Sequence, residues 1–294
     1  MGGKALERVR ALLLLGCLSS PLLPAYAASC VWAVHGPRNT VYLAGSVHLL
    51  PAQDAALPAA FDRAYTDSAR LVMELDLGRL DPLAAAGWML EHGTLPSGTS
   101  LRTVLGEQRY LKVSAAAAEL GLPAEVLDTQ APWVVGIELA DLQYQHLGLD
   151  PQQGVEEQLV HRAQADGKPT AGLETLDEEL GGLEALPTQD QVRLLDQTLS
   201  ELQDSPAELR EIVGAWRNGD TAKLAALLSR EYRSFPALYR PLVTERNERW
   251  LPKIEELLRG RENSLVLVGS LHLVGDGGLL ELLRKAGFTP VQLN

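Results

Sequence analysis

The chain has 294 residues, a net charge of −12 at pH 7 and only two cysteines. The acidic balance argues against nucleic acid as a partner, because phosphate backbones are held by clustered lysine and arginine. One cysteine falls in the leader described next, so the remaining chain cannot form an internal disulfide and has to be stabilised by a buried core.

The first 27 residues have the pattern of an export signal. A basic start precedes an apolar run, and Ala25-Tyr-Ala27 is a small-x-small cleavage site. We therefore predict a signal peptide over residues 1–27, a single domain over residues 28–294 and an exported protein, periplasmic or extracellular. No later stretch offers the roughly 20 uncharged residues of a membrane helix, so we expect no transmembrane span in the mature chain. Lipid attachment at Cys17 or Cys30 is an alternative to full release.

The first elements of the mature chain are predicted to form a β-α-β unit. An apolar strand ends in Gly45-Ser-Val-His48, a helix is expected over residues 54–68, and a second strand over residues 69–77. By its two-residue period the second strand carries Glu74 and Asp76 on one side. A carboxylate in so apolar a strand is costly to bury unless a cation or strong donors meet it. Both are therefore candidate site residues, with a salt bridge to an arginine as the structural alternative.

Helices dominate the middle of the chain. Residues 81–130 alternate alanine-rich helical stretches with proline and glycine breaks, which is typical of helical hairpins and predicts a cap on the sheet. A helix begins at Ala131, another ends near Gln164, and a short strand over residues 170–175 delivers Glu174 at its end. Glu174 is a third acidic candidate, with helix capping or a salt bridge as the structural alternative.

From residue 188 to residue 261 the sequence is almost entirely helical. The last helix, over residues 241–258, has Arg246 and Trp250 on one face because they are four residues apart. An arginine on a core-facing stripe needs a carboxylate or an anionic substrate group opposite it. We therefore expect the Arg246 guanidinium to lie among the predicted carboxylates at the sheet edge.

The strand after this helix repeats the ending of the first one. An apolar run over residues 265–268 leads into Gly269-Ser-Leu-His272, followed by a closing helix over residues 277–286 and a last strand over residues 288–293. A glycine lets the backbone turn tightly, and open α/β sheets bind ligands just beyond the carboxyl ends of their strands. We predict that His48 and His272 meet there and share one cation or one substrate.

These stretches, in this order, resemble the TraB/GumN family, also called TraB/PrgY/GumN, which is related to the TIKI metalloproteases and more distantly to the erythromycin esterases. The resemblance covers nearly the whole mature chain and is carried by Val41–His48, Met73–Asp76, Pro132-Trp133, Gly154–Glu156, Gly167–Pro169, Gly172–Thr175, Arg246-Asn247 and Val268–His272. The family usually has aspartate where this chain has Glu156, and threonine where it has Ser46.

The resemblance implies an α/β fold with a central sheet. The elements above predict that this sheet is mostly parallel, has two Gly-x-x-His strand ends and is covered by helices and a helical cap. The resemblance also implies that the paired histidines and the glutamate of the second strand line one cleft. In the TIKI relatives that cleft carries a divalent-metal-dependent peptidase activity, whereas erythromycin esterases use a similar set of residues on a lactone.

The first functional hypothesis is an exported, peptidase-like, metal-dependent hydrolase. His48, Glu74 and His272 would bind one divalent cation, Zn, Mn or Co, through two nitrogens and one oxygen, and would leave a position open for water. The bound cation would acidify that water, and the substrate would be a peptide or a small molecule.

The remaining candidates have roles in the same hypothesis. Glu174 would accept the proton of the water, and Arg246 with Asn247 would stabilise the developing oxyanion. A metal-free variant would use Glu74 and a histidine as general base. The second hypothesis is a binding protein that captures a peptide or small ligand in the same cleft without turning it over.

Overall fold

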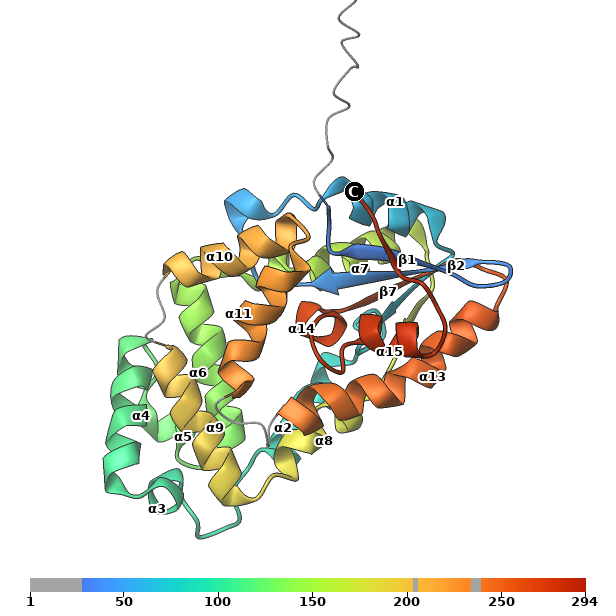
Figure 1. The fold of residues 1–294 in the computed structure, drawn as a ribbon. Coiled ribbons are helices and arrows are strands. Elements are labelled where there is room, and N and C mark those ends of the chain that lie inside the picture. The colour runs from blue at the N-terminus through green and yellow to red at the C-terminus, as the bar shows by residue number, and fades with distance from the viewer. Residues whose placement is uncertain (1–27, 203–205, 234–238) are drawn as a thin grey trace, which may run out of the picture.

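A mixed six-stranded sheet lies at the centre of the molecule (Figure 1). The computed structural model of the chain describes residues 28–202, 206–233 and 239–294, so the predicted signal peptide lies outside the described residues. The strands are β1 (Val31–His35), β2 (Thr40–Ser46), β3 (Leu50–Pro51), β4 (Arg70–Met73), β5 (Leu149–Asp150), β6 (Thr170–Gly172), β7 (Ser264–Gly269) and β8 (Val291–Gln292).

The helices of the described chain form the layers around the sheet and the cap beside it. They are α1 (Ala59–Asp67), α2 (Pro82–His92), α3 (Leu101–Leu105), α4 (Glu107–Glu119), α5 (Ala124–Leu127), α6 (Pro132–His146), α7 (Val155–Asp166), α8 (Leu176–Glu184), α9 (Thr188–Glu201), α10 (Pro206–Arg217), α11 (Thr221–Arg233), α13 (Glu245–Arg259), α14 (Ser270–Leu273) and α15 (Leu279–Lys285). Short 3-10 turns cover Ala52–Asp54 and Pro151–Gln153, and a π turn over Arg240–Thr244 precedes α13.

The strand order is β6-β4-β7-β2-β1-β8. The pairs from β6 to β2 are parallel, and β1 pairs antiparallel with both β2 and β8. The predicted α/β class and mostly parallel sheet are thus confirmed, with an antiparallel edge in addition. The predicted elements did not include β1, which precedes β2 and is joined to it by a short turn at residues 36–39.

Helices cover both faces of the sheet, as its composition requires. Every residue of β7 is buried, which is why the strand reads as a continuous apolar run instead of an alternating one. In Figure 1, α1 and α7 lie on one face and α13 to α15 on the other, while α3 to α6 with α9 form the cap to one side and α2 lies beside α8. The cap has an apolar cluster of its own, which includes Leu101, Val113, Leu127, Leu139 and Leu195.

Two predicted strands end earlier than the sequence pattern indicated. The second strand was expected over residues 69–77, but β4 ends at Met73, so Glu74 and Asp76 lie in the loop beyond it. In the same way β6 ends at Gly172 and Glu174 follows it. Both glutamates therefore leave the sheet at its carboxyl edge, where the chain is free to aim their side chains away from the apolar layers.

Among the described residues, no helix is long and apolar enough to cross a membrane. Cys30 is 1% exposed in the main core. Burial raises the pKa of its thiol to about 12, so the side chain behaves as a small apolar residue.

Gly154 allows α7 to approach the first Gly-x-x-His turn. A Cβ on Gly154 would collide with the backbone carbonyl oxygen of His48. The next residue, Val155, donates its N–H to the Val47 carbonyl oxygen over 3.2 Å. The missing side chain thus lets the first turn of α7 dock on this loop, and Glu156 comes within reach of His48.

We expect Gly154→Ala to destabilise the protein by about 1–3 kcal/mol, because a carbonyl group cannot yield as a flexible side chain would. Urea unfolding followed by circular dichroism measures the change in the free energy of unfolding. Gly87→Ala is the matched control, since Gly87 lies inside α2 with open space around it. That control should gain about 0.5–1 kcal/mol from helix propensity, and a similar gain in Gly154→Ala would contradict the close-approach argument.

Candidate functional site

The two Gly-x-x-His endings lie side by side at the carboxyl edge of the sheet. β2 and β7 are parallel neighbours, with Ser46 opposite Gly269 in the register. The Ser270 hydroxyl donates to the Ser46 carbonyl oxygen over 2.8 Å and ties the two endings together. The prediction that these strands are neighbours is therefore confirmed.

The three residues predicted as metal ligands surround one point beside Gly269. A Cβ built on this glycine would contact one atom from each of them: Glu74 Oε1 at 3.3 Å, His272 Cδ2 at 3.7 Å and His48 Nε2 at 3.8 Å. The Gly269 N–H donates to Glu74 Oε1 over 2.6 Å. A glycine at this position keeps the space between the three side chains open.

His48 is the accessible member of the histidine pair, with 70% of its side chain exposed. Its Nδ1 lies 2.8 Å from Glu156 Oε1, and the Ser46 hydroxyl donates to the same carboxylate oxygen. The negative charge of Glu156 raises the pKa of His48 to about 10. The ring is thus held by Nδ1, which leaves Nε2 on the side of Gly269.

His272 is the buried member, with 7% of its side chain exposed. Its Nδ1 lies 2.8 Å from Asn247 Oδ1, while the Asn247 amide nitrogen donates to the carbonyl oxygens of His272 and Gly277 over 3.2 and 2.9 Å. Two carbonyl acceptors fix the orientation of the amide, so Nδ1 carries the ring proton and Nε2 is an acceptor. Burial lowers the pKa of His272 to about 4, which keeps the ring neutral.

Arg246 is 8% exposed and lies among carboxylates, as expected from its helix face. Its Nε donates to Glu174 Oε1 over 2.8 Å, and Nη2 donates to Glu74 Oε2 over 2.6 Å and also to Glu174. Nη1 makes a longer contact of 3.4 Å with His272 Nε2. The second oxygen of Glu174 accepts the Trp250 indole N–H over 3.0 Å. One guanidinium therefore links the ends of β4 and β6 to the second histidine.

A third glutamate of this cluster, Glu179, is not among the site residues predicted from the sequence. Glu179 lies one turn into α8, with Oε1 3.4 Å from Arg246 Nη2. Burial and the charge of Glu74 raise its pKa to about 7. The available signal was Thr175-x-x-Glu178, a capping box that marks the start of α8 just after the strand-end Glu174 but does not show where the helix packs.

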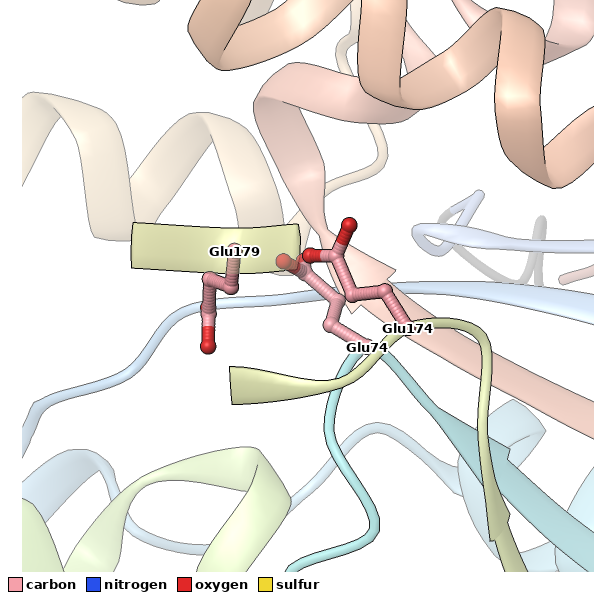
Figure 2. Close-up of side chains that lie close together, drawn as sticks. All are labelled: Glu74, Glu174 and Glu179. Carbon is pink, nitrogen blue, oxygen red and sulfur yellow. The ribbon is translucent and has the colours of Figure 1, made fainter. Parts of the chain in front are cut away.

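Glu74, Glu174 and Glu179 form a cluster that could hold a metal ion. Figure 2 shows the three side chains close together, and one oxygen from each lies within 4.8 Å of the others. Arg246 fills the space between Glu74 and Glu174, because both accept from the same Nη2. A cation would therefore have to approach Glu74 from the histidine side.

The donor atoms on that side suit a divalent metal. Glu74 Oε2 and His272 Nε2 lie 3.9 Å apart, and both are acceptors that cannot bond each other. Burial favours the neutral form of Glu74, but the Arg246 guanidinium, the charge on His48 and the Gly269 N–H together lower its pKa below the ordinary value. An ionised carboxylate and two imidazole nitrogens form a donor set that Zn or Mn accepts.

Two of the sequence candidates lie apart from the open space. Asn247 is fully buried, and its amide is used by His272 and Gly277. Asp76 makes only a 4.0 Å contact with Arg79, and its Oδ1 is buried without a hydrogen-bond partner among the described residues. The structure brings neither side chain to the point beside Gly269.

The fold and this site define a class of α/β proteins in which two Gly-x-x-His strand ends, a strand-end glutamate and a buried arginine meet at one sheet edge. The chain belongs to the TraB/PrgY/gumN family, whose model matches residues 30–292. It is 28% identical over 249 residues to the uncharacterized protein YbaP of Shigella flexneri, covering 85% of this chain and 89% of that protein. It is also 28% identical over 243 residues to YbaP of Escherichia coli K12, covering 83% and 87%. No solved structure matches the chain.

Removal of the Arg246 guanidinium should destabilise the folded protein. Arg246→Ala leaves Glu74 and Glu174 buried without their cation, which we expect to cost about 3–5 kcal/mol of unfolding free energy at neutral pH. Arg246→Lys keeps the charge, loses the forked contacts and should cost less. Without the cation both carboxylates would have folded-state pKa values above their unfolded values, so the deficit should shrink as the pH falls.

Urea unfolding at neutral and mildly acidic pH measures both effects. Arg259→Ala is the matched control, because Arg259 lies at the end of the same helix with 69% of its side chain exposed and pairs with Glu255 instead of the cluster. We expect the control to change stability by no more than about 0.5 kcal/mol. Equal losses in both alanine variants, or a deficit in Arg246→Ala that is unchanged by acidification, would contradict the role of the guanidinium.

Proposed function

We propose that the protein is an exported, metal-dependent hydrolase of peptides or related acyl compounds, in which His48, Glu74 and His272 hold one divalent cation. One observation carries the proposal. Each histidine has its Nδ1 engaged by another side chain, Glu156 or Asn247, so that Nε2 is left for a ligand. Metal-binding histidines almost always have this second partner, which fixes the ring and its tautomer.

The charge of the site also supports a dication of Zn, Mn or Co. Glu74, Glu174 and Glu179 bring up to three negative charges to one place, against the buried guanidinium of Arg246 and a 3.8 Å contact from the partly exposed Arg249. A metal bound at His48 would replace the proton that Glu156 favours on that ring. Close carboxylates repel one another and are costly to bury without compensating cations. A divalent ion on the histidine side would balance the charges.

The metal and the residues around it would have distinct roles in the proposed reaction. A divalent metal held by the three ligands would lower the pKa of a bound water, so that hydroxide is available at neutral pH. Arg246 Nη1, on the histidine side of the guanidinium, would donate to the oxygen on which charge develops. Glu174 and Asn247 are fully used by their neighbours, which favours positioning roles: Glu174 holds Arg246, and Asn247 holds His272.

Export remains part of the proposal, on the strength of the predicted signal peptide over residues 1–27. A lipid on the Cys30 sulfur would have to remove that side chain from the core, where it is 1% exposed. The proposal therefore favours a released protein, with Cys17 as the remaining attachment point.

We expect the purified protein to retain Zn or Mn, and His48→Ala and His272→Ala each to bind it at least ~10-fold more weakly. Elemental analysis after dialysis against low metal concentrations provides the measurement. His161→Ala is the control, because His161 has 59% of its side chain exposed and contacts only Glu157 among the described residues. The same metal content in all four proteins would exclude the proposed ligand set.

Turnover is tested with a mixture of unlabelled peptides and simple esters read by mass spectrometry. We expect cleavage that stops on addition of a chelator and returns with Zn, Mn or Co, because the metal supplies the nucleophile. Glu74→Gln should remove turnover in a protein that remains folded. Tight retention of a library member without product, in protein loaded with metal, would favour the binding hypothesis instead.

A further inference from the structure

We propose that Glu179 is the catalytic carboxylate that takes a proton from the attacking water and returns it to the leaving group. This inference rests on the proposed hydrolase function. In the balanced step, one O–H bond of water breaks and its proton goes to Glu179, while the water oxygen bonds to the acyl carbon. The bond from that carbon to the leaving nitrogen or oxygen then breaks, and the leaving atom takes the proton from Glu179.

The other two glutamates of the cluster already accept hydrogen bonds on both carboxylate oxygens. Glu174 has 1% of its side chain exposed and accepts two N–H groups from Arg246 and one from Trp250. Glu74 accepts from the Gly269 N–H and from Arg246. A carboxylate that already receives strong donors on both oxygens is a poor acceptor for a further proton.

Glu156 is also engaged, although it belongs to the other histidine. One of its oxygens meets both His48 Nδ1 and the Ser46 hydroxyl. The second oxygen is buried, so it is out of reach of a substrate that enters from solvent. Its place behind His48 suits a residue that orients the ring.

Glu179 differs from all three in its contacts and exposure. Its one polar side-chain contact among the described residues is the 3.4 Å approach to Arg246, longer than a normal charge-assisted hydrogen bond. The side chain is 23% exposed, the largest fraction in the carboxylate cluster. The carboxylate therefore has the freedom and the solvent access that a group exchanging protons with a substrate needs.

The position of Glu179 fits the same task. One of its oxygens lies within 4.8 Å of an oxygen of Glu74 and of Glu174 (Figure 2), so a single water can bridge it to the carboxylate of Glu74, a proposed metal ligand. The helix that carries it is held in place by the reciprocal capping box of Thr175 and Glu178. A pKa raised to about 7 supports the role, because proton transfer at neutral pH is most efficient for such a group.

The test is Glu179→Gln, which keeps the shape of the side chain and removes its capacity to take a proton. With the library member that the wild type cleaves fastest, kcat should fall by about 10²- to 10⁴-fold. Metal content, KM and the urea midpoint should stay at wild-type values. Glu184→Gln is the matched control on the same helix, since Glu184 contacts His92 outside the cluster and Gln can keep that hydrogen bond.

The outcomes separate this inference from the proposed function. A kcat in Glu179→Gln equal to that of Glu184→Gln overturns the role of Glu179 and leaves the hydrolase proposal intact. Loss of metal together with turnover in Glu179→Gln also overturns it, because the residue would then be a ligand. A wild-type protein that holds metal but cleaves nothing overturns both proposals. A fall in the kcat of Glu179→Gln that is larger for a peptide than for a p-nitrophenyl ester supports the return of the proton to the leaving group, because p-nitrophenolate leaves without a proton.

Discussion

The buried guanidinium of Arg246 is the interaction on which the rest of the site depends. Two neighbouring strands, β4 and β6, each end by turning a glutamate towards the same space, and two carboxylates so close would repel each other. Arg246 meets both with one planar group, as its fork geometry allows. Trp250 supports the arrangement twice, since its indole N–H binds Glu174 and the Arg246 guanidinium carbon lies 4.8 Å from its ring centroid. The sheet edge is thereby tied to α13.

Two turns with nearly the same sequence become chemically different through their neighbours. His48 is exposed and faces a carboxylate, so its ring is pushed towards the protonated form. His272 is buried and faces a neutral amide, so its ring is kept neutral. A metal bound at both rings would therefore have to displace a proton from His48, whereas the neutral His272 already offers Nε2 as an acceptor. The pair is therefore symmetric in backbone position, while its buried half has a fixed tautomer and its exposed half is open to solvent.

The sequence was sufficient for the parts of the fold that follow from strand order. Two apolar strands with the same ending predicted parallel neighbours and a shared edge, and that is how β2 and β7 lie. The sequence could not locate the end of β4, because the alternation of apolar and polar residues continues beyond Met73 through Glu74 and Asp76. The cluster also needed a residue from α8, and nothing in the local pattern at Glu179 shows which helix will lie over which strand end. Contacts between distant segments decide such points, and a single sequence records them only indirectly.

Each Gly-x-x-His motif needs its glycine for a different reason from the one that the sequence indicated. A tight turn was expected, but neither Gly45 nor Gly269 has a positive φ, and the backbone of Gly269 (φ −51°, ψ 138°) is open to most residues. The constraint is space. A Cβ on Gly45 would lie 2.8 Å from the Ser270 hydroxyl, so a side chain there would separate the two endings. A Cβ on Gly269 would enter the gap between Glu74 and the histidines. The motif glycines therefore matter because they lack a side chain. Gly45 lets the two strand ends come into contact, and Gly269 keeps space for a ligand between Glu74, His48 and His272.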